Sequence, residues 1–280
     1  MKFHREPLTF VGNVNLKVQN LEHSLLFYKE VVGFKVLEQT DRTASLTADG
    51  KTVLLNLEQP EDIVPKTGRT TGLYHFALLL PERADLANIV QHFSEIGLRI
   101  GSSDHLVSEA LYFSDPDGNG IEIYTDRPAS DWNWTNNEVN MAVDPLDFND
   151  LLSIKRDHPW NGLPAQTVMG HIHLQVSELA KTEEFYTKGL GFDVVCRYGH
   201  QALFISTGNY HHHIGLNTWN GVGAPPPAAN SAGLEFYTLM LPNKEKRKEI
   251  VERLKSIGAP VSEGFMTEDP SGNRILLQVL

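Results

Sequence analysis

The stretch that decides the fold runs from Val11 to Phe34 and reads VGNVNLKVQNLEHSLLFYKEVVGF. It returns from Met169 to Phe192 as MGHIHLQVSELAKTEEFYTKGLGF, with eight of the 24 positions identical. Two shorter repeats follow in the same order. They are GLYHFALLLP at 72–81 with GLEFYTLMLP at 233–242, and DPDGN at 115–119 with DPSGN at 269–273. A duplication that keeps its order along the chain predicts two similar halves.

The first repeat predicts one strand, one helix and then three short strands. Residues 11–18 alternate between apolar and polar side chains, the period of a half-buried strand. Residues 21–32 carry apolar side chains at helical spacing, and this pattern ends at Gly33. The three strands that follow are expected at 34–40, 44–47 and 53–57.

The same βαβββ order returns in residues 72–126, so each half holds two modules and the chain holds four. We expect an N-terminal half at 1–126 and a C-terminal half at 169–280. Residues 127–168, rich in proline and tryptophan, are the predicted linker between the halves.

Composition and charge narrow the class of protein. The chain has 280 residues, 41% of them hydrophobic and 21% charged, as in ordinary globular proteins. Lys+Arg is 24 against Asp+Glu 35, a net charge of −11, which disfavours nucleic-acid and membrane-surface binding. No apolar run is long enough to span a bilayer. The single cysteine, Cys196, excludes an intrachain disulfide, and a cytoplasmic protein is expected.

The repeats resemble those of the vicinal oxygen chelate superfamily, which includes glyoxalase I, extradiol ring-cleaving dioxygenases and bleomycin-resistance proteins. The resemblance rests on G-x-x-x-L-x-V-x-x-L…F-Y…G-F in modules one and three, and on D-P-x-G-N in modules two and four. It covers nearly all of the chain outside the linker. It implies an α+β fold in which four βαβββ modules pair into two incomplete barrels, with the helices outside and a metal on a concave face.

Strand alternation sorts the side chains that point into such a barrel. Apolar residues flank His75, His171 and Glu122 at every second position, so these three are expected on the cavity face. By the same alignment, module one offers Asn13 and module four offers Phe236 and Leu276. Only modules two and three therefore carry metal-ligating side chains.

Two imidazoles and one carboxylate form the facial triad of non-haem Fe(II) oxygenases. His75, His171 and Glu122 are accordingly the predicted metal ligands. Fe(II) is the expected metal, with Mn, Zn and Ni as alternatives.

The resemblance also implies residues around the metal. Extradiol dioxygenases carry a tyrosine at a similar spacing before their metal-binding Glu, which indicates Tyr112 as a catalytic residue. Their His-His segment resembles residues 210–216, where alternation predicts that His211 and His213 face the cavity and His212 does not. His213 is then the predicted acid–base histidine, or a fourth metal ligand.

Other histidines receive weaker assignments. His173 and His105 are candidates for substrate binding, with cavity filling and a loop position as the alternatives. The histidines expected at the surface are His4, His23, His92, His158 and His200.

The division of ligands between modules has a structural consequence. The ligands meet only if module two pairs with module three, leaving modules one and four to pair, or if two chains exchange halves. The long linker permits either arrangement.

The leading hypothesis is an extradiol dioxygenase acting on a catechol-like aromatic and dioxygen. A glyoxalase-type lyase or isomerase using Zn or Ni is the alternative, and it gains if His213 reaches the metal. A metal-free small-molecule binding protein is the third class, and the ligand trio argues against it. Neither nucleic acid nor a membrane is expected as a partner, and a homo-oligomer is compatible with the sequence.

Overall fold

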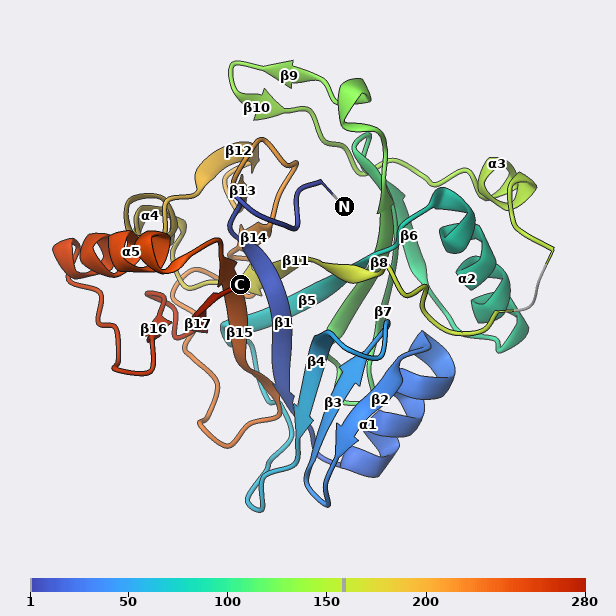
Figure 1. Cartoon of the computed structure of the whole chain (residues 1–280), viewed down its shortest axis with the longest axis horizontal. Helices are drawn as coiled ribbons and strands as arrows, with labels where there is room; N and C mark the ends of the chain where they lie inside the picture. The colour runs from blue at the N-terminus through green and yellow to red at the C-terminus, as the bar shows by residue number, and fades with distance from the viewer. Residues whose placement is uncertain (1, 158–159) are drawn as a thin grey trace.

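The computed structural model describes residues 2–157 and 160–280, which contain two large curved sheets (Figure 1). Each sheet takes strands from both halves of the chain. The predicted α+β class is confirmed, with two curled sheets that form half-barrels and helices outside them. The module pairing is confirmed as well, since modules one and four share one sheet while modules two and three share the other.

The first sheet has the order β16-β17-β15-β1-β4-β3-β2. Its strands are β1 (Phe10–Lys17), β2 (Lys35–Gln39), β3 (Thr43–Thr47), β4 (Val53–Glu58), β15 (Gly233–Leu241), β16 (Met266–Glu268) and β17 (Arg274–Val279). The first strands of modules one and four, β1 and β15, pair antiparallel at its centre. This pair joins the two ends of the chain.

The second sheet has the order β12-β13-β14-β11-β5-β8-β7-β6. Its strands are β5 (Gly72–Leu79), β6 (Gly101–Asp104), β7 (Ser108–Ser114), β8 (Gly120–Asp126), β11 (Val168–Gln175), β12 (Asp193–Tyr198), β13 (Ala202–Ser206) and β14 (Ile214–Asn217). At its centre β5 and β11 pair antiparallel, and β8 runs parallel to β5. Strand β6 was not among the predicted elements.

Helices cover the outside of the sheets (Figure 1). They are α1 (Leu21–Phe27), α2 (Arg83–Glu95), α4 (Leu179–Glu184) and α5 (Lys244–Ser256), while α3 (Phe148–Ser153) packs against α2. The Asn20 side chain accepts a hydrogen bond from the His23 backbone N–H and begins α1. A π-helical turn, Tyr28–Val32, continues α1 to Gly33, where φ is +91°, a left-handed conformation that favours glycine. The helix therefore ends where the sequence predicted.

The alternating strand pattern separates core from cavity. Phe76, Leu78, Ile172 and Leu174 are buried in one continuous hydrophobic core together with side chains of the first sheet. The intervening residues of β5 and β11 point to the opposite, concave face of the second sheet. That face carries the histidines.

The linker adds structure of its own. A small hairpin of β9 (Trp134–Thr135) and β10 (Glu138–Val139) precedes α3. Between them and α3, Asp144 exchanges backbone hydrogen bonds of 2.9 and 3.0 Å with Asp104 at the edge of β6. The linker is thereby attached along the rim of the second sheet.

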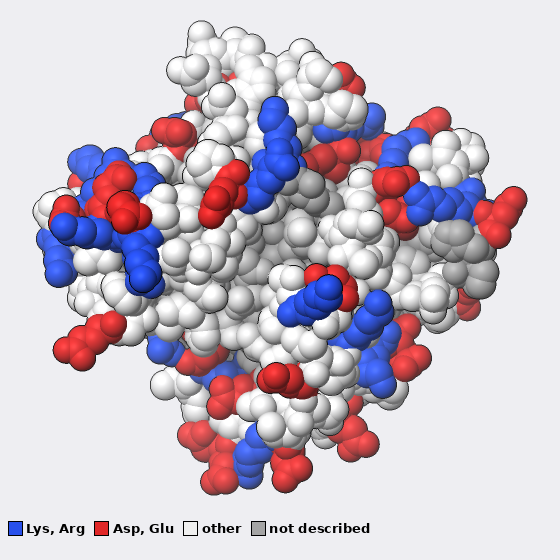
Figure 2. All heavy atoms as spheres, in the orientation of Figure 1, with Lys and Arg blue, Asp and Glu red and all other residues white. Residues whose placement is uncertain are grey.

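In the view of Figure 2, acidic and basic side chains are interspersed, without an unbroken basic area on this face. Among the described residues, no helix is long and apolar enough to cross a membrane.

Candidate metal centre

Three neighbouring strands bring His75, Glu122 and His171 together. His75 lies on β5, Glu122 on β8 and His171 on β11. In the register, Ala77 stands opposite both His171 and Glu122, so the two side chains flank a methyl group. Backbone pairing alone therefore aims the three ligand candidates at one point.

Their ligating atoms form a compact buried group. Nε2 of His75 and Nε2 of His171 each lie 3.0 Å from Oε2 of Glu122. All the candidate ligand atoms lie within 4.8 Å of one another. The residues are 6%, 1% and 3% exposed for His75, His171 and Glu122. No other group of three such side chains is found among the described residues.

The charge states of the group suit a cation. Burial tends to raise the pKa of Glu122, but His171 and His75 outweigh it and hold that pKa well below its usual range. Burial lowers the pKa of His171 to about 4, although Glu122 opposes the shift. The carboxylate is therefore ionised at neutral pH and the His171 imidazole is neutral, the forms that bind a metal.

The residues fit a divalent ion. His75 Nε2 is buried and makes no hydrogen bond, although it lies beside Glu122. A buried carboxylate beside neutral imidazoles is costly unless a cation compensates its charge. Two imidazoles and one carboxylate leave further coordination positions open for small molecules.

A cavity of about 270 Å³ opens onto this group. Its lining is mainly aromatic and aliphatic, with polar side chains near the ligands. The residues that line it outside the ligand group are Tyr74, Ser103, His105, Val107, Ser108, Tyr112, Met141, Ala142, Val143, His173, Tyr198, Phe204, His212 and Trp219. No Lys or Arg is among them.

Tyr112 and His105 form a hydrogen-bonded pair on the cavity wall. The pairing register sets Tyr112 directly opposite Glu122. His105 Nδ1 lies 2.6 Å from the carbonyl of Ala142 and must donate to it, so its Nε2, 2.6 Å from the Tyr112 oxygen, accepts the phenolic hydrogen in a neutral ring. Burial, and then the charge of Glu122, raise the pKa of Tyr112 well above its usual value. Tyr112 is therefore a neutral phenol that is oriented by the linker through His105.

His173 also reaches the cavity. Its ring lies 5.0 Å from the ring of His75 and 5.3 Å from that of Trp219. Its Nε2 is buried without a hydrogen-bond partner. Burial lowers the pKa of His173 well below its usual value, so a neutral ring contributes to the wall.

The prediction that His213 faces the cavity and His212 does not is wrong. His212 lines the cavity, with its ring 4.0 Å from that of His171. His213 Nε2 lies 3.0 Å from the carbonyl of Phe3, and its Nδ1 accepts a 3.3 Å hydrogen bond from the Thr207 N–H. Strand β14 begins only at Ile214, so two-residue alternation does not extend back through residues 211–213. His213 packs under the N-terminal segment and is not in the ligand group.

The histidines that were expected at the surface differ in their exposure to solvent. His23 and His200 are exposed, whereas His4 is buried with Nε2 2.7 Å from the carbonyl of Gly170. His92 is partly buried and stacks on Trp160. His158 lies outside the described residues.

The mirrored face of the first sheet has no equivalent group among the described residues. Asn13 stands opposite Thr238, which stands opposite Leu276, in the register that carries His171, Ala77 and Glu122 in the other sheet. Thr238 donates a 3.0 Å hydrogen bond to the Asn13 side chain. Amide, hydroxyl and aliphatic groups replace the metal ligands there.

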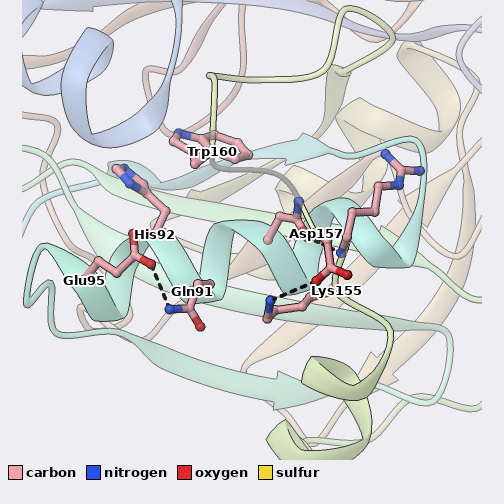
Figure 3. Close-up of a pocket in the computed structure, with 8 residues that line it drawn as sticks. Gln91, His92, Glu95, Lys155, Asp157 and Trp160 are labelled. Atoms are coloured by element: carbon pink, nitrogen blue, oxygen red, sulfur yellow. Dashed lines mark hydrogen bonds and ion pairs between the residues drawn. The ribbon is translucent and has the colours of Figure 1, made fainter.

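A second hollow lies on the outer side of α2 (Figure 3). It is lined in part by Gln91, Glu95, Lys155 and Asp157. Gln91 donates to Glu95 at 2.8 Å, and Lys155 pairs with Asp157 at 3.8 Å. Its polar groups largely satisfy one another, and we assign no chemistry to it.

Sequence reasoning missed several cavity residues. Tyr74 and Trp219 are half-exposed aromatics at the mouth, and Met141 to Val143 come from the linker. Tyr74 lies next to His75 in β5, which is only a weak signal in the sequence. Nothing in the local sequence of residues 141–143 indicates a cavity position. They reach the cavity because the linker pairs with the edge of β6, which is distant in the sequence.

Comparison with known proteins agrees with this geometry. The model of the Glyoxalase/Bleomycin resistance protein/Dioxygenase superfamily matches residues 11–123 and 168–277. The catechol-2,3-dioxygenase of Bacillus subtilis (strain 168) is 49% identical over 269 residues, which are 94% of each chain.

Solved structures share the fold. A protein from Bacillus subtilis subsp. subtilis strain 168 gives a TM-score of 0.65 at 12% identity, covering 96% of this chain and 84% of its own. Glyoxalase I from Zea mays gives 0.58 at 14% identity, covering 96% and 92%. These two similarities concern the fold alone. Through the family match and the 49% identity, the chain belongs to the glyoxalase/bleomycin resistance protein/dioxygenase superfamily.

Proposed function

We propose that the protein is a metal-dependent extradiol dioxygenase that cleaves the ring of a catechol-like aromatic with dioxygen. The observation that carries the proposal is the His75–Glu122–His171 group at the end of an aromatic-lined cavity. The 49% identity to a catechol-2,3-dioxygenase over 94% of the chain supports it.

His75, Glu122 and His171 would hold the metal, and we propose Fe(II). When bound, Fe(II) supplies a Lewis acid with open positions for the two substrate oxygens and for dioxygen, and it passes electron density between them. Two neutral ligands and one carboxylate leave the divalent site with one net positive charge, which favours an anionic catechol oxygen.

The cavity residues would bind and orient the ring. Tyr74, Phe204 and Trp219 offer aromatic surface, and Met141 and Val143 add apolar surface from the linker. An aromatic ring bound against these side chains would displace water from the ligand group. Because no Lys or Arg lines the cavity, an aromatic without a carboxylate substituent fits it best.

Two polar groups would act on the substrate hydroxyls. The Tyr112 hydroxyl donates its hydrogen to His105, so its oxygen is free to accept a hydrogen bond from a substrate hydroxyl. His212 lines the same cavity, and burial lowers its pKa well below the usual value. A neutral imidazole in this position can take a proton from a substrate hydroxyl and return it to the product. We therefore assign the acid–base role to His212 in place of His213.

Anaerobic loading with Fe(II), followed by oxygen uptake with catechol, tests the proposal. We expect uptake of one dioxygen per catechol and a product heavier than catechol by two oxygen atoms. Protein that retains its metal but consumes no oxygen with catechol would contradict the proposed reaction.

A matched pair of variants tests the assignment of the acid–base group. His212→Phe should keep its metal and lose about 10²-fold or more in kcat. His213→Phe should keep both, because that ring bonds only to backbone groups. The reverse result would restore His213 to the role, and loss of metal in His213→Phe would favour a lyase with a fourth ligand.

A further inference from the structure

A line of hydrogen bonds leads from the cavity to the partly exposed Asp126 at the end of β8. His212, on the cavity wall, has its Nδ1 2.8 Å from Nδ1 of His211. His211 has its Nε2 2.8 Å from Oδ1 of Asp126, at the end of β8. Asp126 also accepts a 3.1 Å hydrogen bond from the hydroxyl of Tyr210, and its side chain is 23% exposed.

The chemistry of each group sets the direction of these bonds. A carboxylate only accepts, so His211 must donate from Nε2 to Asp126. A neutral imidazole with its hydrogen on Nε2 has a lone pair on Nδ1, which can only accept. The hydrogen between the two rings therefore belongs to Nδ1 of His212. In a neutral ring this leaves the Nε2 of His212 with a lone pair.

We propose that Asp126 is a positioning residue that fixes the tautomers of His211 and His212 in series, so that His212 presents an unprotonated Nε2. No hydrogen bond occupies this nitrogen among the described residues. The arrangement extends the carboxylate–imidazole pair of serine hydrolases, where the carboxylate fixes the tautomer of one histidine, by a second ring.

Both rings are packed among other rings, and burial favours the neutral form of His212. His211 is fully buried, and its ring lies 4.1 Å from that of Tyr210 at a tilt of 36°. His212 is buried between His171 and Phe204, with ring separations of 4.0 and 5.0 Å. Burial, and then the neighbouring imidazoles, lower the pKa of His212. For two neutral rings, the hydrogen bonds from His212 to His211 and from His211 to Asp126 allow only this one direction.

The consequence for turnover rests on the proposed function. A lone pair on His212 Nε2 accepts a hydrogen bond from a substrate hydroxyl, whereas the other tautomer presents an N–H that cannot. The tautomer itself does not depend on which reaction the protein catalyses.

The first experiment reads the tautomer directly. Long-range ¹H–¹⁵N spectra of the full chain, labelled with ¹⁵N-histidine and loaded with Zn(II), are recorded at pH 8, where histidines are ordinarily neutral. The His212 and His211 signals are assigned by their absence from the His212→Phe and His211→Phe variants. We expect Nδ1–H for His212 and Nε2–H for His211. An Nε2–H form of His212 would overturn the proposal, whether or not the protein oxidises catechol.

The second experiment removes the carboxylate. Asp126→Leu leaves the two rings without a fixed direction, so both His212 tautomers should be populated. Tyr210→Phe is the matched control, because it removes the other hydrogen bond to Asp126 and should preserve the single tautomer. A single unchanged tautomer in Asp126→Leu would overturn the role of Asp126.

Turnover supplies the third measurement. Asp126→Leu should lose about 10-fold in kcat with its metal content unchanged, a smaller loss than that of His212→Phe. In the His212→Phe background the same substitution should cost nothing further, because Asp126 acts through that ring. Additive losses would indicate a general structural role and contradict the proposal. If no variant or wild-type protein turns over catechol, the proposed function fails while the spectra still decide the tautomer.

Discussion

The Tyr28 hydroxyl donates a 2.8 Å hydrogen bond to Oδ2 of Asp115, and this contact joins the two sequence motifs of the N-terminal half. Tyr28 belongs to module one, whose strands lie in the first sheet, and Asp115 begins the turn before β8 of the second sheet. The duplicated half repeats the contact, with Tyr186 donating to Asp269 at 3.2 Å. Each F-Y motif thus meets a D-P-x-G-N turn and ties the two sheets together.

Replacement of Tyr28 by Phe should lower the free energy of unfolding by about 1–3 kcal/mol, because a buried carboxylate loses a donor. Asp115 is buried, as the burial-raised pKa of its carboxyl reflects, so water does not replace the lost hydrogen-bond donor. Urea titration measures the change. Metal content serves as the control and should stay at the wild-type value, since neither residue is in the ligand group. An unchanged unfolding midpoint would show that the contact contributes nothing.

Replacement of Glu122 by Gln should abolish tight metal binding. The amide lacks the negative charge with which the Glu122 carboxylate attracts and partly neutralises the divalent ion. Metal analysis after loading should give one ion per wild-type chain and at least 10-fold less for the variant. Metal should also raise the melting temperature of the wild type and leave that of Glu122→Gln unchanged.

Glu95→Gln, on the exposed side of α2, is the control and should bind metal like the wild type. Full occupancy of Glu122→Gln would remove this residue from the site. Two ions per wild-type chain would mean that the mirrored sheet also binds metal.

Enlarging Ala77 should block the metal site without touching a ligand. Its methyl group lies between His171 and Glu122 in the register, and it is fully buried. Three further carbon atoms in Ala77→Leu would occupy space that the ion needs, and relief would require the strands to shift. We expect metal affinity to fall by 10-fold or more, measured by competition with a chelator. Ala77→Gly, which adds no volume, should retain the metal, and equal affinity in the Leu variant would contradict the placement.

Acid should destabilise the protein partly through His4. Burial lowers the pKa of His4 to about 4, against the opposing hydrogen bond to the Gly170 carbonyl. The unfolded state, with a pKa near 6.5, therefore binds the proton more readily than the folded state. Stability from the neutral ring is present above about pH 6.5 and is lost as the pH falls towards 4.

The measurement compares metal-free wild type with His4→Phe by urea unfolding between pH 7 and pH 4. The advantage of the wild type over the variant should shrink by about 3 kcal/mol across this range. A constant difference would show that His4 takes up no proton on unfolding there.

The amino-acid sequence alone predicted the fold and the grouping of three candidate metal ligands. The duplication predicted four modules, and two-residue alternation placed His75, His171 and Glu122 on one face. Because modules one and four lack candidate ligands, the sequence required either the pairing of modules two and three or an exchange of halves between chains, and the structure shows the first. These inferences succeed because strand periodicity and repeat order are local properties, and an apolar face must be buried whatever the rest of the chain does.

Only the tertiary structure decided which histidine of the His211–His213 segment enters the cavity. The segment lies outside β14, so strand periodicity does not apply to it. The His213 ring instead lies 3.0 Å from the backbone carbonyl of Phe3, away from the cavity. The same holds for Asp126, which meets His211 across 85 residues of sequence. It holds also for Met141 to Val143, which reach the cavity because the linker bonds to the edge of β6. Contacts of this kind depend on how distant segments pack against one another, so they cannot be predicted from the residues adjacent in the sequence.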